Sequence, residues 1–160
     1  MSEHRENELP PLEKTKNKYQ KPFPRETVVT LVETEGPAHV GPFRGAIDYA
    51  MKLGTPVIAP LDGIVRDTDD SHSRFGPTEE FKDDANYITI GHQNDEFSQM
   101  VHLAKGSIKV KKGDFVKAGQ QLAVTGNSGW MTEPHLHFLV FKLATDENGF
   151  KGLDPQLEDR

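Results

Sequence analysis

Short apolar runs rich in β-branched residues recur along the chain between turns that contain Gly or Pro. Examples are TVVTLVE at 27–33, VIA at 57–59 and GIV at 63–65, the last two joined by the tight connection PLD. Runs of this length and composition, bounded by Gly and Pro, are typical of strands. The first half of the chain therefore predicts several short strands, with a further apolar stretch, AIDYAM, at 46–51.

The second half of the chain continues this pattern with longer apolar runs. NYITIGH at 86–92 and FSQMVHL at 97–103 predict a hairpin around residues 93–96. Glycines divide the segment 108–126 into short extended pieces. HLHFLVFKL at 135–143 is the most continuous apolar run, and its length and its Phe and Val content favour a buried strand over a helix.

Many short strands without a long amphipathic helix predict an all-β fold, a compact antiparallel β domain of the sandwich or barrel-like kind. We expect this domain over residues 25–145. The charged, Pro-rich residues 1–24 predict a flexible N-terminal arm. The acidic, aperiodic residues 67–85 predict a surface insertion, and the polar residues 146–160 predict a C-terminal tail.

Composition limits the partners and the kinds of catalytic or metal site that the chain can have. The chain has 160 residues, a formal charge of −6 and a pI near 5.6. Nucleic-acid binding relies on clustered Lys and Arg, so we expect no nucleic-acid partner. The chain contains no cysteine, which excludes disulfides, thiolate zinc sites and a cysteine nucleophile. Any metal site must therefore use His, Asp or Glu.

The N-terminal residues MSEHRENELPPLEK have no apolar core of the kind found in secretory signals. No window approaches the roughly 20 apolar residues of a membrane helix, so we expect no membrane span. As encoded, the sequence predicts a cytoplasmic protein unless it is released or exported by another route. No pattern indicates an oligomeric state.

Two histidines lie two residues apart in the predicted strand 135–143. Side chains at i and i+2 of a strand project from the same face, so His135 and His137 can share one site. One could bind a metal while the other meets the substrate. The alternative is two half-buried histidines without a shared role, because a short HxH pattern is a frequent false positive.

Three further residues favour a shared site. Asp48 lies inside the apolar stretch AIDYAM, where burial of an unpartnered carboxylate is costly and a metal ion would remove that cost. The alternative for Asp48 is an edge position facing water or a pair with Arg44. His102 ends the strand 97–103, a place also common for a core histidine. His39 lies in a Gly- and Pro-rich loop, from which a side chain can turn into a site.

A catalytic zinc commonly has three protein ligands and a water molecule in the fourth position. His39, Asp48 and one histidine of the 135/137 pair would supply three such ligands. The chain has no HExxH pattern, so it lacks the helical metalloprotease arrangement with its Glu base. The remaining histidines are then the natural groups for proton transfer.

An ordered set of blocks resembles the M23 family of zinc metallopeptidases, of the LytM or lysostaphin type. The blocks are FRGAIDYAMKLGTPVIAPLDGIV, NYITIGH, MVHLAKG, VKKGDFVKAGQQLAVTGNSG and PHLHF, and they extend from about His39 to Phe141, roughly two thirds of the chain. The resemblance implies a compact, mostly antiparallel β domain with a groove, and a Zn²⁺-dependent endopeptidase. The family most often cleaves short peptides of peptidoglycan.

The resemblance also implies a role for each site residue. His39, Asp48 and His137 would be the metal ligands. His102 and His135 would be the catalytic or transition-state-stabilising residues, one accepting a proton from water and the other donating to the oxyanion. The sequence leaves open which histidine has which role.

One position departs from the commoner family pattern. Many members have the first metal-binding histidine four residues before the aspartate, where this chain has Arg44. Arginine stays protonated and cannot bind zinc. His39, nine residues before Asp48, would take its place in the longer spacing that some branches of the family carry. His72 and His92 are the alternatives.

Other functions compete with the peptidase. A catalytically silent relative that regulates cell-wall hydrolases would usually lack one or more of the five positions, whereas all five can be filled here. Biotinyl and lipoyl carrier domains share the short strands and Gly-rich turns, but their lysine is usually beside a methionine. The segment 69–96 offers only Lys82, without such a neighbour. The sequence thus favours an active hydrolase.

Overall fold

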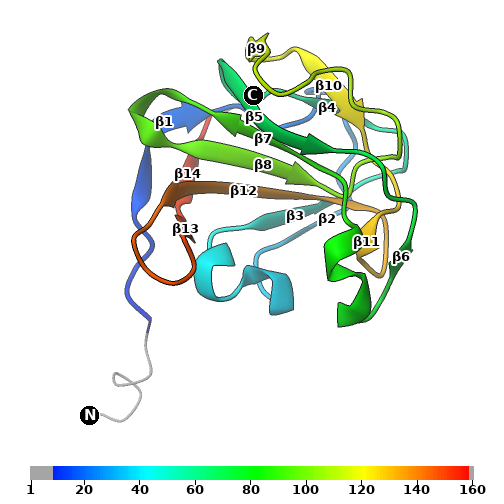
Figure 1. Ribbon diagram of the computed structural model, residues 1–160, viewed down its shortest axis with the longest axis horizontal. Helices are drawn as coiled ribbons and strands as arrows, with labels where there is room; N and C mark the ends of the chain where they lie inside the picture. Colours follow the sequence, from blue (N-terminus) through cyan, green and yellow to red (C-terminus); the bar gives the residue numbers. More distant parts are fainter. Residues whose placement is uncertain (1–8, 159–160) are drawn as a thin grey trace.

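The largest element of the computed structural model, which describes residues 9–158, is one antiparallel sheet of eight strands. Its strands follow the order β2 (Leu31–Glu33), β3 (Ile47–Ala50), β12 (His135–Leu143), β8 (Phe97–Val101), β7 (Tyr87–Gly91), β5 (Gly63–Asp69) and β9 (Phe115–Val116), with β13 (Phe150–Gly152) paired to β12 beside this path. Figure 1 shows β12, β8 and β7 side by side in the middle of the molecule.

Three two-stranded sheets and four 3-10 helices surround the large sheet. The pairs are β4 (Pro56–Ile58) with β10 (Gln121–Val124), β6 (Phe75–Gly76) with β11 (Gly129–Trp130), and β1 (Lys14–Tyr19) with β14 (Asp154–Leu157). The helices are η1 (Pro37–His39), η2 (Gly41–Phe43), η3 (Glu79–Asp84) and η4 (Gln93–Asp95). Between residues 9 and 158 there is no α-helix, so the all-β class and the antiparallel sheet predicted from the sequence are confirmed.

One face of the large sheet forms the hydrophobic core. Ile88 and Ile90 of β7, Met100 of β8, and Leu136 and Phe138 of β12 are all fully buried in one cluster. Their spacing of two residues follows from strand geometry, in which alternate side chains point to opposite faces. The residues between them must therefore point to the other face of the sheet.

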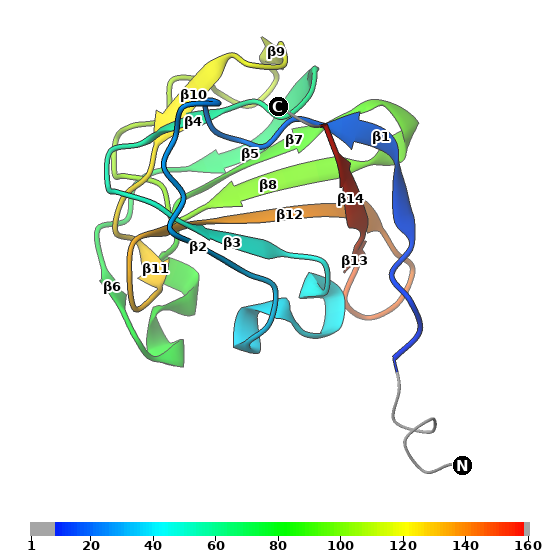
Figure 2. The same ribbon diagram turned by 180° about the vertical axis from the view of Figure 1, so that it is seen from behind.

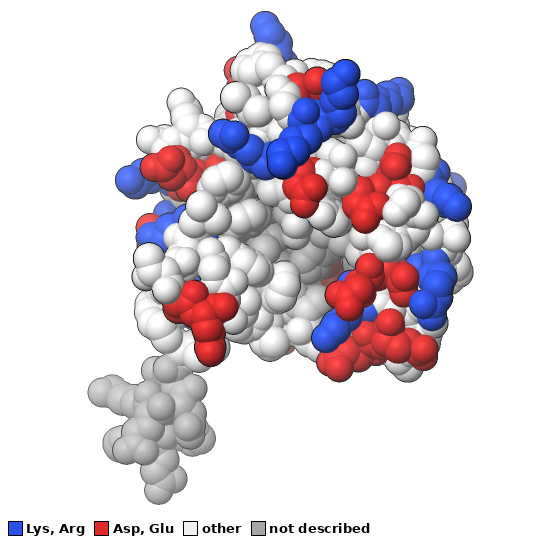
Figure 3. Space-filling view, in the orientation of Figure 1, with Lys and Arg blue, Asp and Glu red and all other residues white. Residues whose placement is uncertain are grey.

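That other face is the floor of a cleft. Its cross-strand partners include His137 with Asp48, His137 with Val101, and Tyr87 with Val101. In Figure 1, η1 and η2 lie below this floor and η3 lies at its side. Figure 3 shows a hollow in the same face, with charged side chains gathered over the region of η3. The large sheet thus has the hydrophobic core on one face and an open cleft on the other.

The N-terminal segment differs from the sequence prediction. A flexible arm was predicted over residues 1–24, but residues 14–19 form β1, which pairs in parallel with β14, and Figure 2 shows the two side by side. Strand β1 buries Thr15, Asn17 and Tyr19 and exposes the lysines between them. Two of these inward residues are polar, so the usual apolar alternation was missing from the sequence. Residues 1–8 lie outside the described part of the chain.

Two other boundaries also differ from the prediction. The predicted C-terminal tail, 146–160, contributes strands β13 and β14, and Leu153 between them is buried in the core. The predicted insertion, 67–85, begins inside β5, which extends to Asp69, and only its later part forms the lobe of β6 and η3. The predicted hairpin around 93–96 is confirmed, since β7 and β8 pair across η4.

Candidate metal centre

Three side chains from separate elements converge at one end of the cleft floor. His39 ends η1, Asp48 lies in β3, and His137 lies in β12, and one ligand atom from each falls within 4.8 Å of the others. His39 Nε2 lies 2.9 Å from Asp48 Oδ2, and His137 Nδ1 lies 2.9 Å from Asp48 Oδ1. Asp48 and His137 meet because they are direct cross-strand partners in the β3–β12 pair.

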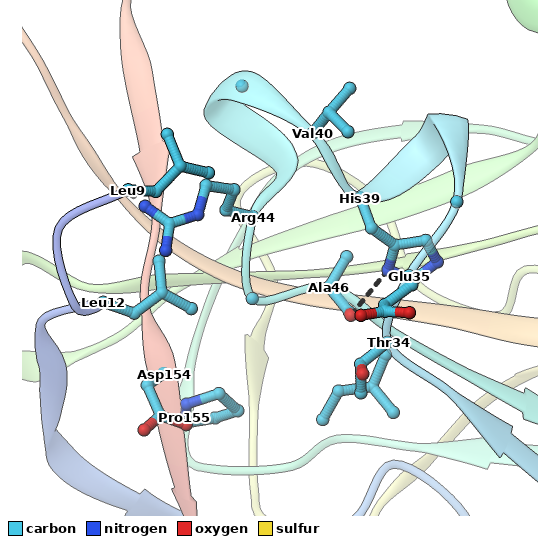
Figure 4. A pocket seen from close by; sticks show the side chains of 14 residues that line it. Leu9, Leu12, Thr34, Glu35, His39, Val40, Arg44, Ala46, Asp154 and Pro155 are labelled. Carbon is cyan, nitrogen blue, oxygen red and sulfur yellow. Dashed lines mark hydrogen bonds between the residues drawn. The ribbon is translucent and has the colours of Figure 1, made fainter. Parts of the chain in front are cut away.

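His39 reaches the cluster from the loop that leads into β3. Its Nδ1–H donates to the carbonyl oxygen of Ala46 at 2.7 Å, which orients the ring, as Figure 4 shows. Gly45 has a positive φ of 95° and leaves no room for a Cβ, because the backbone of Leu153 lies against it. This close approach lets the loop turn back over the sheet and brings His39 to Asp48.

The donor set of this cluster fits zinc. When Nδ1–H of His39 donates to Ala46, the neutral ring turns the lone pair of Nε2 toward a carboxylate oxygen of Asp48. Two acceptors at this distance require a proton or a cation between them. Two histidines and one carboxylate are a set that catalytic zinc uses, and a carbonyl partner for the second ring nitrogen is the usual outer support.

The charge on Asp48 is stabilised by its neighbours. Burial alone raises the pKa of this carboxyl, but the hydrogen bond and charge of His137, the charge of His135 and, when Nε2 of His39 carries a proton, the hydrogen bond of His39 together hold the pKa below its usual value. Asp48 is therefore an anion in the neutral pH range. An anionic oxygen donor between two imidazoles suits a divalent cation.

His102 and His135 form a second pair beside the cluster. Their ring centroids are 4.5 Å apart in an edge-on arrangement. Each donates its Nδ1–H to a backbone carbonyl, His102 to Ser128 at 2.7 Å and His135 to Glu133 at 2.9 Å. In the neutral rings, Nε2 is then the proton acceptor in both residues. Nε2 of His135 also lies 3.7 Å from Asp48 Oδ1.

Burial sets the protonation state of His102. Desolvation, reinforced by the positive charges that His135 and His137 can carry, lowers the pKa of His102 to about 3. His102 is therefore neutral at pH 7 and presents an unprotonated Nε2. A neutral imidazole next to a metal centre can accept a proton from water.

Hollows lie on both sides of this five-residue centre. The larger has a volume of about 440 Å³ and runs between η1–η2 and the lobe of η3 and β11. It is lined by Pro37, Ala38, Phe43, Lys82, Asp83, Ala85, Tyr87, Gln99, Val101, His102, Trp130 and His137. The smaller, of about 70 Å³, includes Asp48 and His135 in its lining, together with Glu33 and Glu133. An extended chain could therefore cross the centre from one hollow to the other.

The other candidate residues from the sequence lie away from the cluster. Arg44 does not pair with Asp48; its guanidinium donates to the carbonyl oxygen of Pro10, and Figure 4 shows it turned toward Leu9, away from His39. It lines another cavity, of about 730 Å³, whose lining also includes His39 and Ala46.

The two alternative histidines also have other partners. The ring of His72 contacts Asp69 at 3.0 Å and Asp84 at 3.7 Å. The ring of His92 contacts the carbonyl oxygen of Asp62 and the hydroxyl of Ser98. Neither ring joins the cluster, so the longer spacing with His39 is the one that the geometry supports.

Sequence reasoning missed the groups that orient the histidines. The carbonyl oxygens of Ala46, Ser128 and Glu133 belong to residues with no chemical signature, so no motif identifies them. Asn86 is different, because an amide side chain that begins an apolar strand is a visible signal of a buried hydrogen-bond network.

The model of peptidase family M23 matches residues 42–150 of this chain. The chain belongs to peptidase family M23. The matched span includes Asp48, His102, His135 and His137, and His39 lies just before it. The membership inferred from the ordered sequence blocks is confirmed.

Two curated proteins are similar to parts of this chain. Peptidoglycan DD-endopeptidase ShyA from Vibrio cholerae is 37% identical over 116 residues, which cover 72% of this chain and 24% of ShyA. Lysostaphin from Staphylococcus simulans is 36% identical over 93 residues, covering 58% of this chain and 17% of lysostaphin. The chain thus spans about a quarter or less of the length of these curated relatives.

Solved structures of peptidases share the fold. A zinc-containing peptidase from Vibrio cholerae superposes with a TM-score of 0.60 at 25% identity, covering 89% of this chain and 40% of that one. The catalytic domain of lysostaphin superposes with a TM-score of 0.54 at 25% identity, covering 85% of each chain. The M23 fold therefore extends over most of the described residues.

Proposed function

We propose that this M23 chain is a zinc-dependent endopeptidase that hydrolyses amide bonds of short peptides. The observation that carries the proposal is the cluster of His39, Asp48 and His137 at the floor of a cleft, with His102 and His135 beside it. The first three residues would hold the metal. Zinc bound there would polarise the scissile carbonyl and lower the pKa of a water molecule to about 7.

The chain's own residues would then move the proton. His102 has an unprotonated Nε2 that can accept a proton, and because its pKa is lowered it would release that proton readily to the leaving amine. His135 is less buried than His102, and its Nε2 lies 3.7 Å from Asp48 Oδ1. We assign the acceptor role to His102 and the oxyanion-facing donor role to His135.

The substrate proposed is a peptide of peptidoglycan. Several similar proteins are named peptidoglycan DD-endopeptidases or lysostaphin, which supports this class of substrate. The larger hollow has walls that offer aromatic, amide and charged groups from Tyr87, Gln99 and Lys82. The rest of the lining is largely apolar, so these walls suit a peptide with both apolar and polar groups.

Metal analysis of purified variants tests the ligand assignment. Wild type should carry about one zinc ion per chain, removable by a chelator, whereas Asp48→Ala and His137→Ala should lose the metal. His72→Ala is the matched control, because this histidine lies outside the cluster, and it should keep its zinc. Full zinc occupancy in either ligand variant would refute the assignment.

Hydrolysis tests the catalytic assignment separately. His102→Ala and His135→Ala should keep zinc but release new amino groups from peptidoglycan about 10²–10⁴-fold more slowly than wild type. A zinc-loaded wild type that releases none at any pH tested would instead indicate a catalytically silent regulator of cell-wall hydrolases.

A further inference from the structure

Asn86 is a fully buried residue at the junction of three segments. Its carbonyl oxygen accepts the backbone N–H groups of His102 and Leu103 at 3.0 and 3.3 Å. Its side-chain amide donates to the carbonyl oxygens of Leu103 and His72, and its Oδ1 accepts the N–H of His72. Asn86 therefore joins the end of β8 to the loop before β6.

Ser128 completes the same network from the turn before β11. Its hydroxyl donates to the carbonyl oxygen of Leu103 at 2.9 Å and accepts the N–H of Asn86 at 3.0 Å. Its own carbonyl oxygen accepts Nδ1–H of His102 at 2.7 Å. The serine is fully buried, so water cannot replace these bonds if they are lost.

The network surrounds a residue with an unusual backbone. His102 has a φ of +74°, the left-handed region that non-glycine residues rarely adopt. Such a conformation costs free energy and persists only where neighbouring contacts over-determine it. The backbone N–H of His102 donates to Asn86, its carbonyl oxygen accepts Gly126, and its ring donates to Ser128. His102 is thus held through its backbone N–H, its carbonyl oxygen and its ring.

We propose that Asn86 and Ser128 are positioning residues for the reaction, acting through His102. Together they hold the left-handed backbone of His102 and keep its ring in the Nδ1–H form, so that Nε2 is the unprotonated nitrogen at the cleft. The proposal rests on the proposed peptidase function for its kinetic consequence, and on the network alone for its structural one.

The same network couples the cleft wall to the catalytic pair. Asn86 holds the backbone of His72, and the residues after it lead to β6, which pairs with β11 and so with Trp130 of the wall. Loss of the network should therefore loosen the His102 ring more than the metal cluster, whose residues are held by bonds to one another and to Ala46.

Kinetics of the zinc-loaded full chain test the catalytic consequence. Ser128→Ala and Asn86→Ala should lower kcat about 10–100-fold, as is typical for loss of a supporting hydrogen bond, with KM and zinc content unchanged. Asn17→Ala is the matched control, because Asn17 is also a buried asparagine with several hydrogen bonds, but on β1. It should lower Tm without changing kcat. An equal kcat effect from Asn17→Ala would reduce Asn86 to a merely structural role.

The tautomer of His102 tests the inference without relying on activity. Ring ¹⁵N–¹H correlation spectra of zinc-loaded wild type should show the proton of His102 on Nδ1. Ser128→Ala keeps the carbonyl oxygen that accepts this proton but removes the hydroxyl bonds to Asn86 and Leu103 that hold the carbonyl in place, so the proton should shift toward a mixture of tautomers. A wild-type proton on Nε2 would overturn the positioning role, even if both alanine variants failed to fold. An inactive wild type with the expected tautomer shift would leave the positioning role intact and refute the proposed function instead.

Discussion

Asp48 is the residue on which the centre depends. Each of its oxygens lies 2.9 Å from an imidazole nitrogen, one of His39 and the other of His137. A partly buried carboxylate with two such partners is costly to leave uncompensated, so removal of any one member changes the charge balance of all three. The cluster therefore behaves as a unit, and single substitutions in it should not be additive.

We expect substitutions of Arg44 and His39 to have different effects on zinc binding. Arg44→Ala should keep zinc and hydrolysis unchanged, because the arginine bonds to Pro10 and does not face Asp48. His39→Ala should weaken zinc binding by more than the roughly 10–100-fold that loss of an outer partner costs. Zinc content by atomic emission after dialysis measures both. Retention of zinc in His39→Ala would show that His39 is not a metal ligand, and loss of zinc in Arg44→Ala would show that Arg44 supports the centre indirectly.

At the scale of residues, the sequence could predict which side chains form the candidate site. It could not predict how those side chains are oriented. His135 and His137 were predictable as neighbours because a strand has a period of two, which is a local rule. Asp48 stood out as a charge in an apolar stretch. The backbone carbonyls that orient His39 and His102 belong to Ala46 and Ser128, whose side chains carry no sign of this role, so only the folded chain reveals them.

At the scale of elements, β1 is held by a buried glutamate on the hairpin of β7 and β8. Glu96 is almost fully buried, and its carboxylate accepts the N–H groups of Lys16 and Asn17 and the hydroxyl of Tyr19. Burial in turn raises the pKa of Tyr19, so its hydroxyl stays a donor. These bonds fasten the N-terminal segment to the domain.

Glu96→Gln should therefore destabilise the protein. The amide replaces one acceptor oxygen with a donor that faces other donors, which costs about 1–3 kcal/mol and should lower Tm by roughly 5 °C. Glu13→Gln is the control, since this exposed carboxylate pairs with Lys142 at the surface, and its Tm should stay within about 1 °C of wild type. Equal Tm values for both variants would show that β1 does not contribute to the folding unit.

Strand β1 also shows where sequence patterns fail for an element. The segment KTKNKY alternates, but the inward residues include Thr15 and Asn17, whose partners are Glu96 and the backbone of β14 and η4. A hydrophobic period detects burial by apolar packing and not burial by hydrogen bonds. The long run 135–143 was predictable for the opposite reason, because it becomes the central strand β12 with apolar neighbours.

At the scale of the molecule, one sheet forms the hydrophobic core with one face and the floor of the cleft with the other. Its buried face packs the apolar cluster, while its open face carries the centre between two hollows. The all-β class could be predicted from many short strands. The strand order could not, because β3 and β12 are far apart in sequence and their pairing depends on the whole chain.

The imidazoles of His92 and His102 are largely buried in this architecture. We expect them to make the free energy of unfolding depend on pH. Burial lowers the pKa of both His92 and His102 in the folded state, whereas in the unfolded chain each titrates near 6.5. As pH falls below about 6.5, the unfolded chain binds protons that the folded chain does not, so the free energy of unfolding decreases. The lowered pKa of Asp48 acts in the same direction, but only below about pH 4.

Thermal unfolding of chelator-treated protein checks this dependence. Between pH 7.5 and pH 5, Tm of wild type should fall by roughly 5 °C or more. His92→Gln and His102→Gln should each show a smaller fall, with Tm at pH 7.5 as the baseline for each variant, because glutamine does not titrate. His92 lies outside the metal cluster, so its contribution separates a general effect of burial from any property of the centre. A fall in Tm that is the same in both variants as in wild type would mean that the buried histidines are not its source.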